Sequence, residues 1–289
     1  MHVKGFASVS LITLVLIAPA ATAQGPVPDS CVARIVEYAS RARSGAAPEY
    51  LLDLPAGPGR LLYFGAVHSS DPAEPQFAAL RAQWERVRPT VAFYEGPPRT
   101  EAATGDETIR QYGESGYVRF LARAGGARIE RLEPDPRDEA RFVAARFPLD
   151  QVKLFYLLRE ASRLRERRGL NETQLREAMD ALLPQVAQRI PEISGLITNT
   201  EELQAAYRRY WTAPANWWEA PAAWFDPLAN SAETGGVFTN DINRASSEFR
   251  NRHMVEVIAR EVRRGERVFA VVGRDHVPAQ APALRCALR

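Results

Sequence analysis

Residues 61–68 have the sequence LLYFGAVH, an apolar run that ends in a histidine. Three later apolar runs are likewise followed by a histidine or a glutamate. VAFY (91–94) is followed by Glu95, ARIERL (127–132) by Glu133, and VFAVV (268–272) by GRDH, which ends at His276. Helical patterns separate these runs, so we expect parallel strands joined by crossovers. Because the carboxyl ends of parallel strands meet at one edge of a sheet, we expect the polar residues that follow them to lie together there.

The elements around these strands predict an α/β fold. An apolar run at 50–54 and a turn with two Gly and two Pro at 55–60 precede the first strand, which predicts a hairpin. Apolar residues at spacings of three and four predict a helix after a start at 71–74 and another over 109–125, ended by Gly125-Gly126. We therefore expect a mixed, mostly parallel sheet flanked by helices.

A helical insertion is predicted before the last core strand. Residues 139–248 show helical periodicity and no convincing strand. Their last third is rich in aromatic residues and proline, and we expect its tryptophans to form the core of the insertion, with a lid or groove as the alternative. These tryptophans are Trp211, Trp217, Trp218 and Trp224. A helix from about Ser247 to Arg264 is expected to lead into the last strand.

The two ends of the chain predict an exported protein. Residues 1–23 combine a weakly basic start, an apolar run of about ten residues and a small-x-small cleavage site, which is typical of a secretory signal peptide. Residues 24–289 then form a single domain, periplasmic or secreted. Outside the cytosol, Cys31 and Cys286 are expected to form a disulfide, with two buried free thiols as the alternative.

Composition limits the classes of partner. Of the residues, 46% are hydrophobic and 25% are charged, which is typical of a globular domain. The net charge of +2 gives no electrostatic reason to expect a nucleic acid or an acidic lipid as partner. No later stretch approaches the roughly 20 apolar residues of a transmembrane helix. Nothing in the sequence determines the oligomeric state.

The strand ends carry the candidate site. Gly65-Ala-Val-His68 and Gly273-Arg-Asp-His276 share the pattern Gly-x-x-His, in which glycine permits a turn or a close backbone approach. Arg250 is expected in the first turn of the last helix, on its core-facing stripe, where it could hold a carboxylate or a developing oxyanion. Asn251 lies beside it.

Each of these residues also has a structural alternative. A histidine at a strand end is often structural, Glu95 could cap the backbone of the glycine and prolines after it, and Glu133 could form a salt bridge within its loop. Arg250 could pair only with a structural acid. The sequence has no Gly-x-Ser-x-Gly elbow, so a serine nucleophile of the α/β-hydrolase type is not supported.

These residues resemble a known family. The segments around 62–68, 94–95, 132–134, 250–251 and 272–276 are similar, in order and spacing, to those of the TraB/GumN/Tiki family, which belongs to a superfamily with the erythromycin esterases and ChaN-type haem-binding lipoproteins. The resemblance implies a mixed α/β fold with hydrolase-like chemistry at the two histidines and the glutamates. Tiki-type members are metal-dependent proteases, whereas erythromycin esterases use His and Glu without a metal. The sequence departs from the family in two places: Pro278-Ala-Gln-Ala-Pro282 follows His276, and Arg274-Asp275 replaces small residues before it. Both changes are expected to crowd the site.

Three functions follow as hypotheses. In a metal-assisted hydrolase, His68, Glu95 and His276 would bind Zn²⁺ or Mn²⁺, Glu133 would be the general base, and Arg250 would stabilise the oxyanion formed from a peptide or small-molecule ester or amide. In a metal-free hydrolase, His68 would be the general base, oriented by Glu95 or Glu133, with His276 and Arg250 on the tetrahedral intermediate. In a binding protein, the two histidines would ligate haem, or the pocket would hold a peptide under the tryptophan-rich segment.

Overall fold

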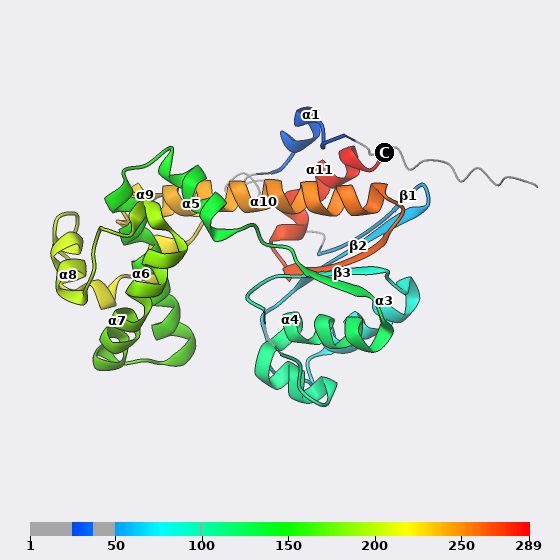
Figure 1. The fold of residues 1–289 in the computed structure, drawn as a ribbon, viewed down its shortest axis with the longest axis horizontal. Helices are drawn as coiled ribbons and strands as arrows, with labels where there is room; N and C mark the ends of the chain where they lie inside the picture. Colours follow the sequence, from blue (N-terminus) through cyan, green and yellow to red (C-terminus); the bar gives the residue numbers. More distant parts are fainter. Residues whose placement is uncertain (1–24, 37–49, 99) are drawn as a thin grey trace, which may run out of the picture.

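The computed structural model describes residues 25–36, 50–98 and 100–289 of the chain (Figure 1). The predicted signal peptide, residues 1–23, lies outside these residues. Within them, no helix combines the length and the apolar character needed to cross a membrane.

A five-stranded sheet forms the centre of the molecule, in the order β1-β2-β5-β3-β4. β1 pairs antiparallel with β2, and the other neighbours are parallel, which confirms the predicted mixed, mostly parallel sheet and its hairpin. The strands are β1 (Leu51–Ala56), β2 (Gly59–Ala66), β3 (Val91–Tyr94), β4 (Arg128–Arg131) and β5 (Arg267–Gly273).

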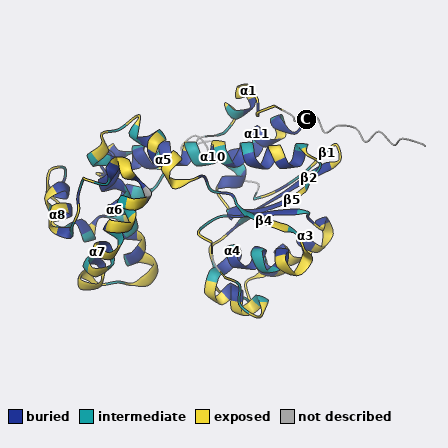
Figure 2. Ribbon diagram, viewed as in Figure 1, coloured by how far each residue is buried: buried dark blue, intermediate teal, exposed yellow. Residues whose placement is uncertain are grey.

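Helices cover both faces of this sheet, which is why its central strands are almost continuously apolar. α10 (Thr239–Arg263) and α11 (His276–Ala287) pack on one face, whereas α3 (Pro75–Val87) and α4 (Gly105–Gly125) pack on the other (Figure 1). Tyr63 of β2 packs in the core between the sheet and the helices α10 and α11. Its neighbour Leu62 packs in the core on the other face, with α3 and α4. Figure 2 shows the buried residues concentrated on the strands and on the helix faces turned toward them.

The two helices on the second face differ in detail from prediction. α3 begins at Pro75, after a turn at the predicted start, 71–74. α4 begins at Gly105 rather than near Ile109, because Thr104 forms a capping box with Glu107. It ends, as predicted, at a left-handed Gly126.

The helical insertion lies between β4 and β5, as predicted, and has a core of its own. No strand occurs in the described residues 132–266. Three tryptophans, Trp211, Trp217 and Trp224, are buried in this core, and Trp211 stacks on Trp224 with ring centroids 4.8 Å apart. The insertion contains α5 (Pro136–Ala144), α6 (Leu149–Arg168), α7 (Glu172–Arg189), η1 (Pro191–Ile193), α8 (Thr200–Arg208), η2 (Trp217–Glu219), η3 (Ala222–Phe225) and α9 (Ser231–Thr234).

α10 joins the insertion to the sheet, and its start corrects a prediction. The helix begins at Thr239, not near Ser247, so Arg250 lies near its middle and not in its first turn. Residues 239–247 contain two asparagines and two serines, a composition that is typical of loops. In the structure these side chains bond to the insertion: Asn240 donates to the carbonyl oxygens of Ala223 and Asp226, both at 2.9 Å.

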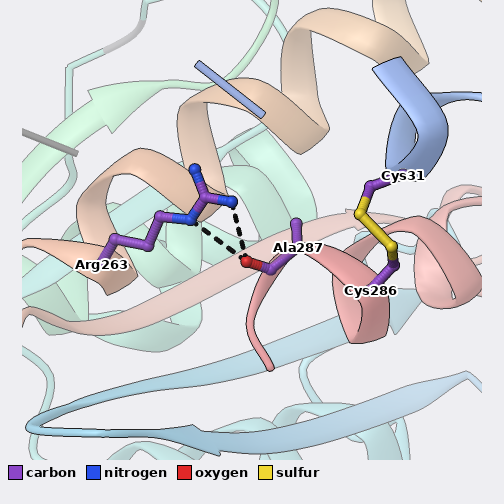
Figure 3. Close-up of a disulfide and its surroundings, with 4 residues drawn as sticks. All are labelled: Cys31, Arg263, Cys286 and Ala287. Atoms are coloured by element: carbon purple, nitrogen blue, oxygen red, sulfur yellow. Dashed lines mark hydrogen bonds between the residues drawn. A yellow bond between two sulfur atoms is a disulfide. The ribbon is translucent and has the colours of Figure 1, made fainter. Parts of the chain in front are cut away.

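A disulfide joins the two ends of the described chain, as predicted. Cys31 of α1 (Asp29–Val32) is bonded to Cys286 of α11, across 255 residues of sequence (Figure 3). Beside it, Arg263 of α10 donates two hydrogen bonds, of 3.1 and 2.9 Å, to the carbonyl oxygen of Ala287 near the end of α11 (Figure 3). These contacts hold α1 and α11 against α10, and α11 carries His276.

Candidate functional site

The carboxyl ends of the parallel strands bring most of the predicted site residues into one hydrogen-bonded network. Glu95 directly follows β3, and Glu133 comes two residues after β4. His276 opens α11 just beyond β5, while α10 supplies Arg250 and Asn251 from the face that packs on the sheet.

Glu95 is the centre of the network. Its Oε1 accepts a hydrogen bond of 2.8 Å from Nη2 of Arg250, and its Oε2 accepts one of 2.7 Å from the backbone N–H of Gly273. Nε2 of His276 lies 3.6 Å from Oε1. Burial opposes the ionisation of Glu95, but His276, Arg250 and the Gly273 N–H together outweigh it and hold the pKa of Glu95 well below its ordinary value.

Arg250 links two strand ends. The same Nη2 that bonds Glu95 also donates to Oε1 of Glu133, at 2.6 Å. Arg250 therefore holds two carboxylates, as expected both for a site residue and for the alternative of a structural ion pair. Glu133 bonds across to α10 rather than only within its own loop.

His276 is held from the other side by amides. Tyr63 Oη donates to Gln280 Oε1 at 3.0 Å, so Gln280 Nε2 is the donor that reaches Asn251 Oδ1 at 2.8 Å. Asn251 Oδ1 therefore accepts from Nδ1–H of His276, also at 2.8 Å, which assigns the proton to Nδ1 and turns Nε2 toward Glu95.

Tyr63 and Gln280 are site residues that no motif in the sequence indicates. Gln280 lies within the proline-containing segment expected to crowd the site. That segment is part of α11, with Pro278 in the first turn, where a helix needs no N–H from the residue. The departure from the family pattern thus supplies a hydrogen-bonding partner.

His68 is held by a residue that the sequence did not indicate. Its Nδ1 lies 2.5 Å from Oε1 of Glu114, a buried carboxylate on α4. The expected partners were Glu95 and Glu133, so that expectation was wrong. The Glu114 hydrogen bond outweighs burial and raises the pKa of His68 above its ordinary value.

A break in α4 places Glu114 there. Gly113 has φ 62° and ψ −150°, a conformation that interrupts the helix and strongly favours glycine. A Cβ at this position would lie 2.8 Å from the carbonyl oxygen of Ser69, next to His68. The signal in the sequence is Gly113 itself, with Gly116 three residues on, inside a helix that was predicted to be continuous.

Gly273 has no side chain, and Glu95, His68 and His276 all border the space that a side chain would occupy there. A Cβ there would lie 3.4 Å from Oε2 of Glu95, 3.7 Å from Nε2 of His68 and 3.9 Å from Cδ2 of His276. Nε2 of His68 therefore faces the Glu95 side. Gly65, the glycine of the other Gly-x-x-His segment, instead permits a close approach of the Arg274 backbone. A Cβ added at Gly65 would lie 2.8 Å from Cα of Arg274.

The predicted metal ligands His68, Glu95 and His276 do not form a metal-binding group in the structure. Among the described residues, no three His, Cys, Asp or Glu side chains converge closely enough to hold a metal ion. Both oxygens of Glu95 are engaged with Arg250 and Gly273, and His68 is bonded to Glu114. Zn²⁺, Mn²⁺ and haem binding stay predictions.

A pocket of about 920 Å³ opens onto this network. The sheet edge contributes His68, Glu133 and His276 to its lining, and α10 contributes Arg250. The opposite wall comes from the insertion: α6, α7, and η3 with the loop after it. The tryptophans do not line the pocket, but Phe225, Pro227 and Leu228 of the same aromatic segment do.

The comparisons with known proteins add no further identification. No family model, no curated protein and no solved structure matches the chain. Membership of the TraB/GumN/Tiki family stays a prediction.

Proposed function

We propose that the protein is a hydrolase of ester or amide bonds that uses His68, oriented by Glu114, as its general base. The single observation that carries this proposal is the contact of 2.5 Å between His68 Nδ1 and the buried Glu114, beside a pocket that Arg250 and His276 also line. A histidine held by a carboxylate, with its second nitrogen facing a pocket, has the arrangement that general-base catalysis requires.

His68 would act through Nε2. Because Nδ1 is directed at Glu114, the second nitrogen is the one that faces Gly273 and Glu95. A water molecule attacks the substrate carbonyl carbon, and its proton moves to Nε2. The C–O or C–N bond then breaks, and the same proton passes to the leaving group. The raised pKa of His68 strengthens it as a base.

Arg250 and His276 would stabilise the oxyanion of the tetrahedral intermediate. Arg250 would donate a hydrogen bond to the oxyanion. Glu95 and Glu133 offset its charge, but they also fix the guanidinium in place, so little reorganisation accompanies the reaction. His276, whose Nδ1–H is held by Asn251, would act through Nε2, which lies 3.6 Å from Oε1 of Glu95. Glu95 and Glu133 are positioning residues in this scheme.

We also propose that the protein acts outside the cytosol. The Cys31–Cys286 disulfide supports this, because such bonds persist mainly in oxidising compartments.

The test is a panel of ester and peptide substrates, assayed with and without a chelator on the disulfide-bonded protein. The proposal expects hydrolysis that survives the chelator and is lost in His68→Ala. His253→Ala is the matched control, because His253 is the remaining described histidine and does not line the pocket. Survival of hydrolysis in His68→Ala would contradict the proposal.

The same preparation distinguishes the other predicted functions. Near-stoichiometric Zn or Mn, measured by mass spectrometry and lost in both His68→Ala and Glu95→Ala, would support the metal-assisted hydrolase instead. A Soret band that appears with haem and moves in His68→Ala or His276→Ala, without any hydrolysis, would support the haem-binding protein.

A further inference from the structure

The insertion wall of the pocket presents a row of arginines. Arg159, Arg163 and Arg167 of α6 are four residues apart, so they share one face of the helix, and all three line the pocket. Arg163 is neutralised by Glu160 through two hydrogen bonds, of 2.8 and 2.5 Å. Arg167 is exposed.

Arg159 differs from both. It is half-buried, and its Nη1 donates to a neutral acceptor, Oδ1 of Asn243, at 3.2 Å. Its guanidinium lies over two rings, 4.8 Å from the centroid of Phe155 and 5.3 Å from that of Tyr156. Within the described part of the chain, no carboxylate lies at ion-pair distance from Arg159.

The surroundings hold this charge in place. Nδ2 of Asn243 donates to the carbonyl oxygen of Phe225 at 2.6 Å, so the amide is fixed with its oxygen toward Arg159. Glu139 of α5, which also lines the pocket, is engaged elsewhere, because it accepts hydrogen bonds from Tyr156 at 3.3 Å and from Ser246 at 2.5 Å. A half-buried guanidinium that lacks a counter-ion is costly, and an anionic ligand would offset that cost.

We propose that Arg159, held by Asn243, binds a carboxylate group of the substrate. The planar guanidinium matches a carboxylate with two parallel hydrogen bonds. A doubly charged phosphate is less favoured than a carboxylate, because Glu133, Glu139 and Asp226 line the same pocket and repel two negative charges more strongly than one. Resting on the proposed hydrolase, this makes the substrate an ester or amide that also bears an acidic group.

The kinetic test compares two esters of one shape, the 4-nitrophenyl esters of 4-carboxyphenylacetic and 4-carbamoylphenylacetic acid. Wild-type protein should prefer the charged ester in kcat/KM by roughly ten- to a hundredfold, which corresponds to one charge-assisted hydrogen-bonded contact. Arg159→Met should remove that preference, and Arg159→Lys, which keeps the charge but loses the planar fork, should retain part of it. Arg163→Met is the matched control and should keep the preference, because Glu160 already neutralises Arg163.

A binding test separates this inference from the proposed function. Benzoate and benzamide, titrated by calorimetry, probe the same site without any reaction. Benzoate binding that is lost in Arg159→Met but kept in Arg163→Met supports the carboxylate site, even if neither ester is hydrolysed and the hydrolase proposal fails. Equal binding of the two probes by the wild type, or a preference that survives in Arg159→Met, overturns the inference, even if hydrolysis is observed.

Discussion

The two Gly-x-x-His segments have the same sequence pattern and different surroundings. His68 follows β2 in an irregular segment, and 57% of its side chain is exposed. His276 opens α11, and only 10% of its side chain is exposed. The glycines differ as well, because Gly65 admits the backbone of Arg274 whereas Gly273 borders the space between the two histidines.

The partners of the two rings differ in charge. His68 is held by the carboxylate of Glu114, whereas His276 is held by the amide of Asn251. A carboxylate favours the protonated ring and makes it a stronger base, whereas an amide oxygen fixes its orientation without adding a charge. The repeated motif therefore gives one accessible base and one buried ring of fixed orientation.

The largest expected effect comes from removing each ring in turn. His68→Ala should lower kcat/KM by about 10²–10⁴-fold, the usual contribution of a general base. It should lower the thermal midpoint only through the lost contact with Glu114, because the ring itself is half-exposed. His276→Ala should lower the stability clearly, because it removes a buried ring and leaves Asn251 without one of its donors. Activity and thermal unfolding of both variants check this. A similar loss of stability in the two variants would show that the two surroundings are equivalent.

The amide that holds His276 gives the next effect. Asn251→Ala removes the one acceptor shared by Nδ1–H of His276 and Nε2–H of Gln280. Two buried donors then lose their shared oxygen acceptor, and Gln280 Nε2 keeps only its contact of 3.3 Å with Sδ of Met254. The free energy of unfolding should therefore fall by about 1–3 kcal/mol. Urea unfolding measures the loss. If stability were unchanged, the amide network would not be what fixes His276.

The two glycines should separate stability from activity. In Gly65→Ala the new Cβ meets backbone atoms at 2.8–3.0 Å, which cannot move easily, so we expect a loss of about 1–3 kcal/mol. In Gly273→Ala the nearest atoms are at 3.4 Å or more, so the fold should tolerate the methyl group. That methyl group lies between His68 and Glu95, and we expect lower kcat/KM with nearly normal urea unfolding. A destabilised Gly273→Ala protein of normal activity would contradict this contrast.

The sequence was sufficient for the sheet because the signals were local. Each apolar run ends at a polar residue, and the crossovers make the strands parallel, so the sequence predicts Glu95, Glu133 and His276 at one edge of the sheet. The sequence also predicts Arg250 near them, but partly for a wrong reason, namely that it lies in the first turn of its helix. Its helix begins two turns earlier than predicted, but it faces the core as the apolar stripe of α10 indicates.

Contacts between residues far apart in the sequence could not be predicted in the same way. Glu114 lies 46 residues from His68 in sequence, and only the break at Gly113 turns it toward the ring. Gln280 lies on a helix that contains two prolines, where sequence rules predict no regular helix. Arg159 and Asn243 meet across 84 residues, through the packing of two helices that the sequence does not orient.

The smallest effect is a shift in pH dependence, and it tests the charge difference between the two partners directly. Glu114 raises the pKa of His68, so the basic form of the ring is lost at a higher pH than in a free histidine. Glu114→Gln removes the negative charge, so the acid limb of the kcat/KM profile should move to lower pH while the maximal rate falls, because the ring is a weaker base. Asn251→Ala changes the partner of the other ring and should leave that limb in place.

The raised pKa of His68 also makes the stability of the protein depend on pH. Because the folded pKa of His68 is raised, the His68–Glu114 pair contributes fully below the unfolded pKa of histidine, and this contribution is lost as the pH rises through the folded pKa. The difference in urea midpoint between wild type and Glu114→Gln should therefore be larger at pH 6 than at pH 9. NMR titration of the ring gives an independent check. An acid limb that moves to higher pH in Glu114→Gln would mean that Glu114 does not stabilise the protonated ring, and the distinction between the two histidines would then rest on exposure alone.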